Sequence, residues 1–239
     1  MPNWCQQYGE VRGPNEDLRR FVDAIRFKET EETRLLSESE KPEWDLNQLF
    51  PIPQELKDTP HSYYSKEAET PEQIEQQRKA QENEAKYGYP DWYEWALGEW
   101  DSKWGACDIS VSDEEFEDGT LNTTCTTLRL DWTSAWSPCV GLIRNISKQF
   151  PHLLFGFHMT EEANFFAGYI ICKNGTVVED SSYNMDTQPE YPKEDTPTEE
   201  QLEIYYEAQS NWYNFMVFEI AEGVSNKMDE LMESQSYWK

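Results

Sequence analysis

The order of strand-like and helix-like stretches is the feature that most constrains how this chain can fold. Stretches with apolar residues at every second position alternate with stretches whose apolar residues recur every three or four positions. The expected strands are 3–13, 106–112, 124–133 and 153–159, and the expected helices are 15–27 and 138–149. This order, strand–helix–strand–strand–helix–strand, is that of a ferredoxin-like fold. The sequence therefore predicts an α+β protein with a ferredoxin-like antiparallel sheet of at least four strands and both helices on one face.

Local signals support these elements. Leu18, Phe21, Val22 and Ile25 are spaced to lie on one side of the first helix, and Asn15 is expected to cap it. Asn174-Gly175 separates two β-rich runs, 165–173 and 176–179, which predicts a hairpin that extends the sheet.

Two segments lie outside this pattern. Residues 54–90 are mostly polar and contain a capping box at Thr70-Pro71-Glu72-Gln73, which predicts a solvent-exposed helical insertion. We therefore expect a ferredoxin-like domain at 1–183, with an acidic linker and a helix at 184–239. The helix is expected at about 198–233, interrupted at Gly223, and amphipathic. It is expected to pack on the domain, and the alternative is a helix that serves a partner or a dimer.

Four blocks of the sequence resemble a known family. They are Met1-Pro2-Asn3-Trp4-Cys5-Gln6, residues 49–56 (LFPIPQEL), residues 100–106 (WDSKWGA) and residues 133–138 (TSAWSP). In this order, over about residues 1–173, the chain resembles the YubB-type ferredoxin-like family of plasmid and phage proteins. The resemblance implies a mobile-element protein that acts inside a bacterial cell, and it supplies no catalytic residues.

The charge is strongly acidic. The chain has 47 Asp and Glu against 20 Lys and Arg, a formal net charge of −27. Such a chain repels nucleic acids and anionic membranes and attracts basic surfaces. Residues 151–239 carry 4 basic and 17 acidic side chains, net −13, so the C-terminal third offers the most anionic surface. Solubility alone is the competing explanation of this charge.

The acidic residues chosen as a candidate partner-binding surface come from two places. One group begins the C-terminal helix, and the other lies in the loop after the second strand. They are Glu199, Glu200, Glu203, Glu207, Glu114, Glu115, Glu117 and Asp118.

Aromatic residues are dense at 89–106, which includes Trp92, Trp95, Trp100 and Trp104. Such a run can form a stacking platform for bases, but a nucleic-acid platform needs basic residues between the rings. Here the interspersed charges are mostly carboxylates, so packing in the core is the favoured interpretation.

No catalytic centre, metal site or cofactor site is predicted. The sequence has no phosphate-binding glycine loop, and the acidic loop 113–119 lacks the ligand spacing of an EF-hand. His158, on an expected strand, is interpreted as structural. Cys5 is the thiol best placed as a nucleophile, but it has no basic neighbour before Arg12 and is also assigned to packing.

The expected compartment is the cytoplasm of a bacterial host. Five scattered cysteines are expected to be reduced thiols there. No apolar run approaches 18 residues, so no membrane span is expected.

Two functions remain. The first is a non-enzymatic binding protein, a monomer or homodimer, that inhibits a basic host protein of defence or nucleic-acid processing, with carboxylates imitating DNA phosphates. The alternative is a nucleic-acid-binding ferredoxin-like accessory domain, for which Arg12, Arg19, Arg20 and Arg26 are the available basic residues. The global charge argues against the alternative.

Overall fold

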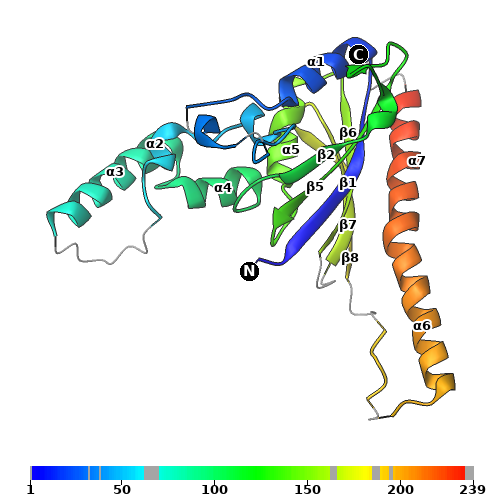
Figure 1. Ribbon diagram of the computed structural model, residues 1–239. Coiled ribbons are helices and arrows are strands. Elements are labelled where there is room, and N and C mark those ends of the chain that lie inside the picture. Colours follow the sequence, from blue (N-terminus) through cyan, green and yellow to red (C-terminus); the bar gives the residue numbers. More distant parts are fainter. Residues whose placement is uncertain are drawn as a thin grey trace.

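An antiparallel sheet forms the centre of the computed structural model (Figure 1). The structure describes residues 2–31, 33–37, 39–61, 70–161, 166–184, 189–193 and 196–234. Within these residues the sheet has six strands in the order β2-β5-β1-β6-β7-β8. Their bounds are β1 (Trp4–Arg12), β2 (Cys107–Val111), β5 (Thr127–Ala135), β6 (Leu154–Glu161), β7 (Phe166–Lys173) and β8 (Thr176–Asn184).

The first four of these strands along the chain have ferredoxin-like topology, as predicted. Helix α1 (Asn15–Ile25) connects β1 to the far edge strand β2, and α5 (Val140–Gln149) connects β5 to β6. Both helices contribute to one hydrophobic core on the same face of the sheet (Figure 1). All four apolar residues of the α1 stripe are buried, so the 3.6-residue pattern identified the core-facing side correctly.

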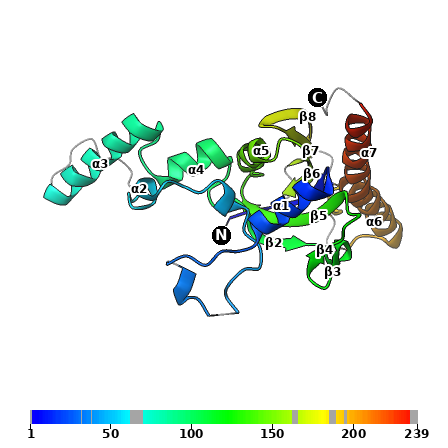
Figure 2. The same ribbon diagram turned by 90° about the horizontal axis from the view of Figure 1, so that it is seen from above.

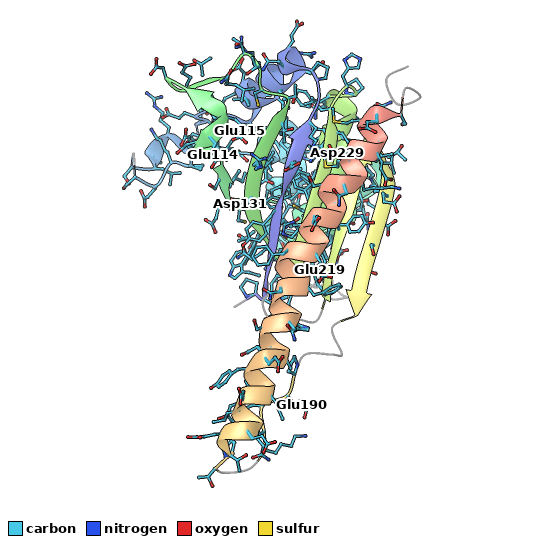
Figure 3. All side chains as sticks on the ribbon, turned by 90° about the vertical axis from the view of Figure 1, so that its right-hand side faces the viewer. Glu114, Glu115, Asp131, Glu190, Glu219 and Asp229 are labelled. Atoms are coloured by element: carbon cyan, nitrogen blue, oxygen red, sulfur yellow. The ribbon has the colours of Figure 1, made fainter. Side chains whose placement is uncertain are left out.

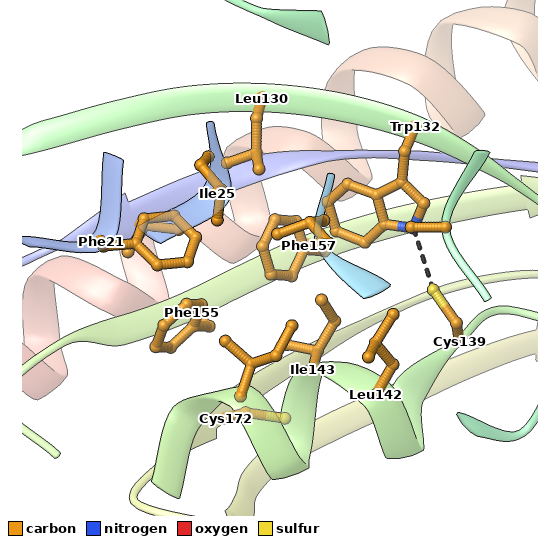
Figure 4. Close-up of a cluster of buried hydrophobic side chains, with 14 of the residues drawn as sticks. Phe21, Ile25, Leu130, Trp132, Cys139, Leu142, Ile143, Phe155, Phe157 and Cys172 are labelled. Carbon is orange, nitrogen blue, oxygen red and sulfur yellow. Dashed lines mark hydrogen bonds between the residues drawn. The ribbon is translucent and has the colours of Figure 1, made fainter. Parts of the chain in front are cut away.

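Aromatic rings fill this core (Figure 4). Phe21 of α1 meets Phe155 of β6 edge to face, with ring centroids 5.4 Å apart. Trp132 of β5 packs in the same way on Phe157, at 4.5 Å, and its indole nitrogen donates a hydrogen bond to the Cys139 sulfur at 3.0 Å (Figure 4). Rings that bury large areas allow a core to form in a chain whose mean hydropathy is only −0.87.

The predicted hairpin joins β7 to β8. Asn174 and Gly175 both have positive φ, 46° and 79°, as a two-residue turn between twisted strands requires. Strand β8 continues to Asn184, beyond the expected end at 179, because residues up to Asn184 pair with β7. The segment between β2 and β5, expected as a loop, forms a short 3-10 turn (Asp113–Glu115) and the two-stranded hairpin β3 (Phe116–Glu117) and β4 (Thr120–Leu121).

The insertion extends away from the sheet on the side opposite the C-terminal helices (Figure 2). It contains α2 (Gln54–Lys57) and α3 (Pro71–Tyr87), and α4 (Trp92–Trp100) follows it and packs on α5. Thr70 and Gln73 form the predicted capping box. Only Ala80 and Asn83 of α3 are buried, in agreement with a helix exposed on nearly all sides.

The C-terminal helices lie on the second face of the sheet (Figure 1). Helix α6 (Glu199–Asn214) passes through a π-helical turn (Phe215–Glu219) into α7 (Ile220–Glu233), which packs on β6 and β7. The expected interruption at Gly223 is wrong, because the irregular turn ends at Glu219, four residues earlier, and Gly223 lies inside regular helix. No helix in the described ranges combines the length and apolar character that crossing a membrane requires.

The expected Asn15 cap is also wrong. Pro14 occupies the cap position, and the Asn15 side chain donates instead to the carbonyl oxygens of Asn122 and Cys125, at 2.8 and 2.9 Å. The Asn15 side chain therefore bonds to a loop that is distant in the sequence and does not cap its own helix.

Candidate functional site

The second face of the sheet is polar where α7 leaves it uncovered. Because side chains alternate along a strand, the residues that face away from the α1 and α5 core share this face. It carries Tyr8, Glu10 and Arg12 from β1, Arg129 and Asp131 from β5, and His158 from β6. Asp131, Tyr8 and His158 stand directly opposite one another, in a row that crosses three strands.

Helix α7 covers the other part of this face. Its Val224 and Met228 pack on Leu154 of β6 and Ile171 of β7 in a small separate core. Gly156 of β6 permits this approach, because a Cβ at that position would lie 2.1 Å from the Met228 sulfur and 3.1 Å from Val224 Cγ1. A glycine thus sets how closely α7 approaches the sheet.

A buried arginine attaches α7 to β1. The side chain of Arg12 is 8% exposed and donates to Glu10 Oε2 at 2.7 Å, to the Ser225 hydroxyl at 2.6 Å and to Asp229 Oδ1 at 2.5 Å. Charge-assisted hydrogen bonds of this kind are directional, so they fix the rotation and register of α7 against the sheet.

A cleft of about 280 Å³ lies between α7 and the polar face. Its lining includes Tyr8, Glu10, Ser110, Ser112, Arg129, Asp131, His158 and Ser225. The rings of Tyr8 and His158 are stacked, with centroids 5.3 Å apart and planes at 21°, and the Tyr8 side chain is 43% exposed. The cleft therefore presents an accessible aromatic ring beside a carboxylate.

Burial shapes the electrostatics of the cleft. It lowers the pKa of His158 to about 4, so the imidazole is neutral at physiological pH. Desolvation also raises the pKa of Asp131 above its usual range. Arg129 donates to Glu115 Oε1 at 2.8 Å and lies 3.4 Å from Glu10 Oε1. The Asp131 carboxylate has no hydrogen-bond or ion-pair partner among the described residues, and desolvation alone accounts for its raised pKa.

The four predicted glutamates of the C-terminal helix are all exposed. Glu199, Glu200, Glu203 and Glu207 lie within the first nine residues of α6, in the part of the helix that projects beyond the end of the sheet (Figure 3) and is called its projecting half below. Thr198 and Gln201 form a capping box that starts this helix, and Glu199 and Glu200 stand in its first turn, where the helix dipole favours negative charge.

Large apolar side chains share this projecting half of α6. Ile204 is 62% exposed and Tyr206 is 57% exposed. Tyr206 and Leu202 form a shallow depression bordered by Glu199, Glu203 and Glu207. On another side of the helix, residues 189–193 lie against it, and the Tyr191 ring meets Tyr205 edge to face at 5.2 Å. The surface is thus both acidic and apolar.

The predicted acidic loop is a different surface. Glu114, Glu117 and Asp118 are exposed, but Glu115 is buried against Arg129, so including Glu115 in an exposed acidic surface was wrong. Figure 3 shows Glu114 and Glu115 near the end of the sheet opposite the one beyond which α6 projects. The two groups of carboxylates do not form one continuous patch.

The tryptophans divide between core and surface. Trp95 and Trp100 are buried, each 5% exposed, as the packing interpretation predicts. Trp104 and Trp136 are 38% and 48% exposed, and their rings lie 5.8 Å apart. Lys103 Nζ is 4.8 Å from the Trp104 ring centroid, a cation–π contact. Trp104 therefore departs from the core assignment.

Nucleophiles and metal ligands form no cluster in the described parts of the chain. All five cysteines are free, and Cys5, Cys139 and Cys172 are buried. Burial raises the pKa of Cys139 to about 12 and that of Cys107 to about 11, so these thiols are not activated. No group of three potential metal ligands is found in the same described residues.

Sequence reasoning missed the cleft. Its residues belong to strands far apart in the chain, and His158, taken alone in the sequence, is interpreted as structural. The available signal was the polar side of each strand, since Tyr8, Glu10 and Arg12 alternate with core residues, as Arg129 and Asp131 do. That alternation identifies polar faces, but only the pairing register brings Asp131 and Tyr8 together.

One family model supports the fold. Residues 106–206 match the family model described as the ferredoxin-like domain in Api92-like protein. The crystal structure of a protein api92 from Yersinia pseudotuberculosis is similar over 77% of this chain and 99% of that chain, with 12% identity and a TM-score of 0.40. No curated protein matches. The chain thus contains a ferredoxin-like domain, and its residues 106–206 are similar to the one found in Api92-like proteins.

Proposed function

We propose that this chain is a non-catalytic binding protein that attaches to a basic partner protein through the projecting half of α6. The observation that carries the proposal is the exposure of Glu199, Glu200, Glu203 and Glu207 together with Ile204 and Tyr206, on a helix that extends beyond the body. Carboxylates attract a basic surface over a distance, and the apolar side chains can then enter a groove on that surface.

The proposed partner is a protein of the bacterial host cytoplasm involved in defence or in nucleic-acid processing, which this chain inhibits. The resemblance to YubB-type proteins of plasmids and phages supports this setting, and the net charge of −27 supports a basic target. Nucleic-acid-binding sites are rich in Lys and Arg that contact phosphates. Carboxylates of α6 can occupy such a site in place of phosphates, while Ile204 and Tyr206 add contacts that DNA lacks.

Capture from a bacterial lysate tests the proposal. The wild-type chain should retain a basic host protein at low salt and release it at high salt, because exposed charges are screened. The variant E199Q/E200Q/E203Q/E207Q should associate with the captured protein about tenfold more slowly, with a smaller effect on dissociation. Ile204→Ala should instead speed dissociation.

Helix α3 supplies the matched control. E72Q/E75Q/E82Q/E84Q removes the same charge from the other projecting helix, where all four glutamates are also exposed. This variant should keep nearly wild-type association. Equal slowing by both variants would show a general charge effect, and no capture of a basic protein at low salt would contradict the proposal.

Nucleic-acid binding is the second candidate, favoured by the exposed Trp104 and Trp136 beside Lys103. Against it, α7 covers part of the sheet face that ferredoxin-like RNA-binding domains use, and Glu10 and Asp131 lie on the rest. Titration with a single-stranded oligonucleotide, followed by tryptophan fluorescence, separates the two. Quenching that Trp136→Ala removes would favour the nucleic-acid function.

A further inference from the structure

The cleft beside α7 has more carboxylates than cations. Arg12 is held by Glu10 and Asp229, and Arg129 is held by Glu115 and Glu10, with Glu114 3.9 Å away. Each arginine is therefore shared by at least two carboxylates. Asp131 adds a further negative charge without a cation beside it in the described residues. The neutral His158 does not offset this excess.

The excess charge lies next to a ring. Asp131 stands directly opposite Tyr8 on one side and Ser110 on the other. Side chains so paired on neighbouring antiparallel strands have Cβ atoms about 5 Å apart. Tyr8 is accessible in the cleft, and its stacking on His158 fixes the orientation of its ring. One ligand group can therefore contact the ring and the carboxylate at the same time.

A guanidinium fits these two contacts better than an ammonium. It is planar and weakly hydrated, so it stacks on an aromatic ring, and its fork of N–H donors matches a carboxylate. The hydroxyls of Ser110 and Ser112 provide further acceptors at the same wall. A cleft of about 280 Å³ is below the usual range for small-molecule pockets, roughly 300–1,000 Å³, and suits one long side chain.

We propose that this cleft receives an arginine side chain of the basic partner protein, with the guanidinium stacked on Tyr8 and donating to the Asp131 carboxylate. The inference rests on the proposed function only in taking the occupant from a basic protein. The cleft then supplies a specific anchor, and the glutamates of α6 supply long-range attraction.

The test is an NMR titration of the isotope-labelled full chain with Ac-Gly-Arg-Gly-NH2, and with Ac-Gly-Lys-Gly-NH2 at equal ionic strength. The arginine peptide should shift the amide signals of β1 and β5 around Tyr8 and Asp131 in a saturable way. The lysine peptide should bind at least several-fold more weakly. Equal shifts with both peptides, or no shifts in these strands, would overturn the proposal.

Variants locate the contact. Asp131→Asn keeps the shape of the side chain and should lower affinity for the arginine peptide about tenfold, and Tyr8→Leu should lower it several-fold. Glu84→Gln on α3, exposed and remote, is the control and should leave binding unchanged. Unchanged affinity in Asp131→Asn would also overturn the proposal. Because the peptide assay omits the partner, its failure is distinct from a failure of capture through α6.

Discussion

His158 shows how one side chain acquires its chemistry from its surroundings. It lies on β6 beside Tyr8, and burial lowers its pKa to about 4 from the usual 6.5. Between about pH 4 and 6.5 the unfolded chain therefore binds a proton that the folded chain does not. The neutral ring provides stability that is fully present above about pH 6.5 and is lost as the pH falls towards 4.

His158→Gln should remove this dependence. We expect the difference in unfolding free energy between wild type and variant to shrink, by at most about 3 kcal/mol, as the pH falls from 7 to 4. Urea unfolding at a series of pH values measures it, and taking the difference cancels the titration of the many carboxylates. His152→Gln is the control, because the His152 side chain is 67% exposed. Parallel profiles for wild type and His158→Gln would contradict the assignment.

At the scale of elements, the docking of α7 depends on the glycine beneath it. Gly156→Ala places a methyl group against Met228 and Val224, so α7 must shift or Met228 must change rotamer. We expect a loss of about 1–3 kcal/mol of unfolding free energy. Gly223→Ala, on α7 itself, meets nothing within 4 Å and should stabilise the helix by about 0.5–1 kcal/mol. Denaturant unfolding measures the free energy of unfolding of both variants. A change of the same sign in both would contradict the proposed role of Gly156.

Elements were predictable where their signals are local. A capping box spans four consecutive positions, so the one that begins at Thr70 was predictable from the sequence. The buried stripe of α1 likewise repeats within one helix. Asn15 and Glu115 were misassigned because their partners, the Asn122 carbonyl and Arg129, are brought to them only by folding.

The two candidate sites differ in the same way, because one is local in the sequence and the other is assembled by folding. The glutamates of α6 are exposed on one continuous helix, so their spacing alone placed them together. The cleft needs β1, β5 and β6 in one register and α7 beside them, and no stretch of the chain contains that information. Register is set by which strand faces are buried, so a polar row such as Asp131, Tyr8 and His158 emerges only from the assembled sheet.

At the scale of the whole molecule, the docking of α7 on the sheet determines how α6 projects from it. Helix α7 is fixed to the sheet by a small apolar core and by Arg12, whereas the first half of α6 continues past the sheet with apolar residues exposed. The docked half gives the projecting half a defined direction. A helix held in this way loses less conformational freedom on binding than a free segment would, which favours its use as a partner surface.

The net charge of −27 also bears on folding, since like charges repel most in the compact state. Added salt weakens this repulsion, but it also weakens ion pairs such as Arg12–Asp229. With 47 acidic and 20 basic residues, repulsion outnumbers attraction, and we expect the melting temperature to rise by several degrees between 10 and 300 mM NaCl. Calorimetry measures this, and KCl should give the same curve if ionic strength is the cause. The E199Q/E200Q/E203Q/E207Q variant should show a shallower rise. A melting temperature that falls with salt would mean that the ion pairs around Arg12 and Arg129, and not the net charge, dominate the electrostatics of the fold.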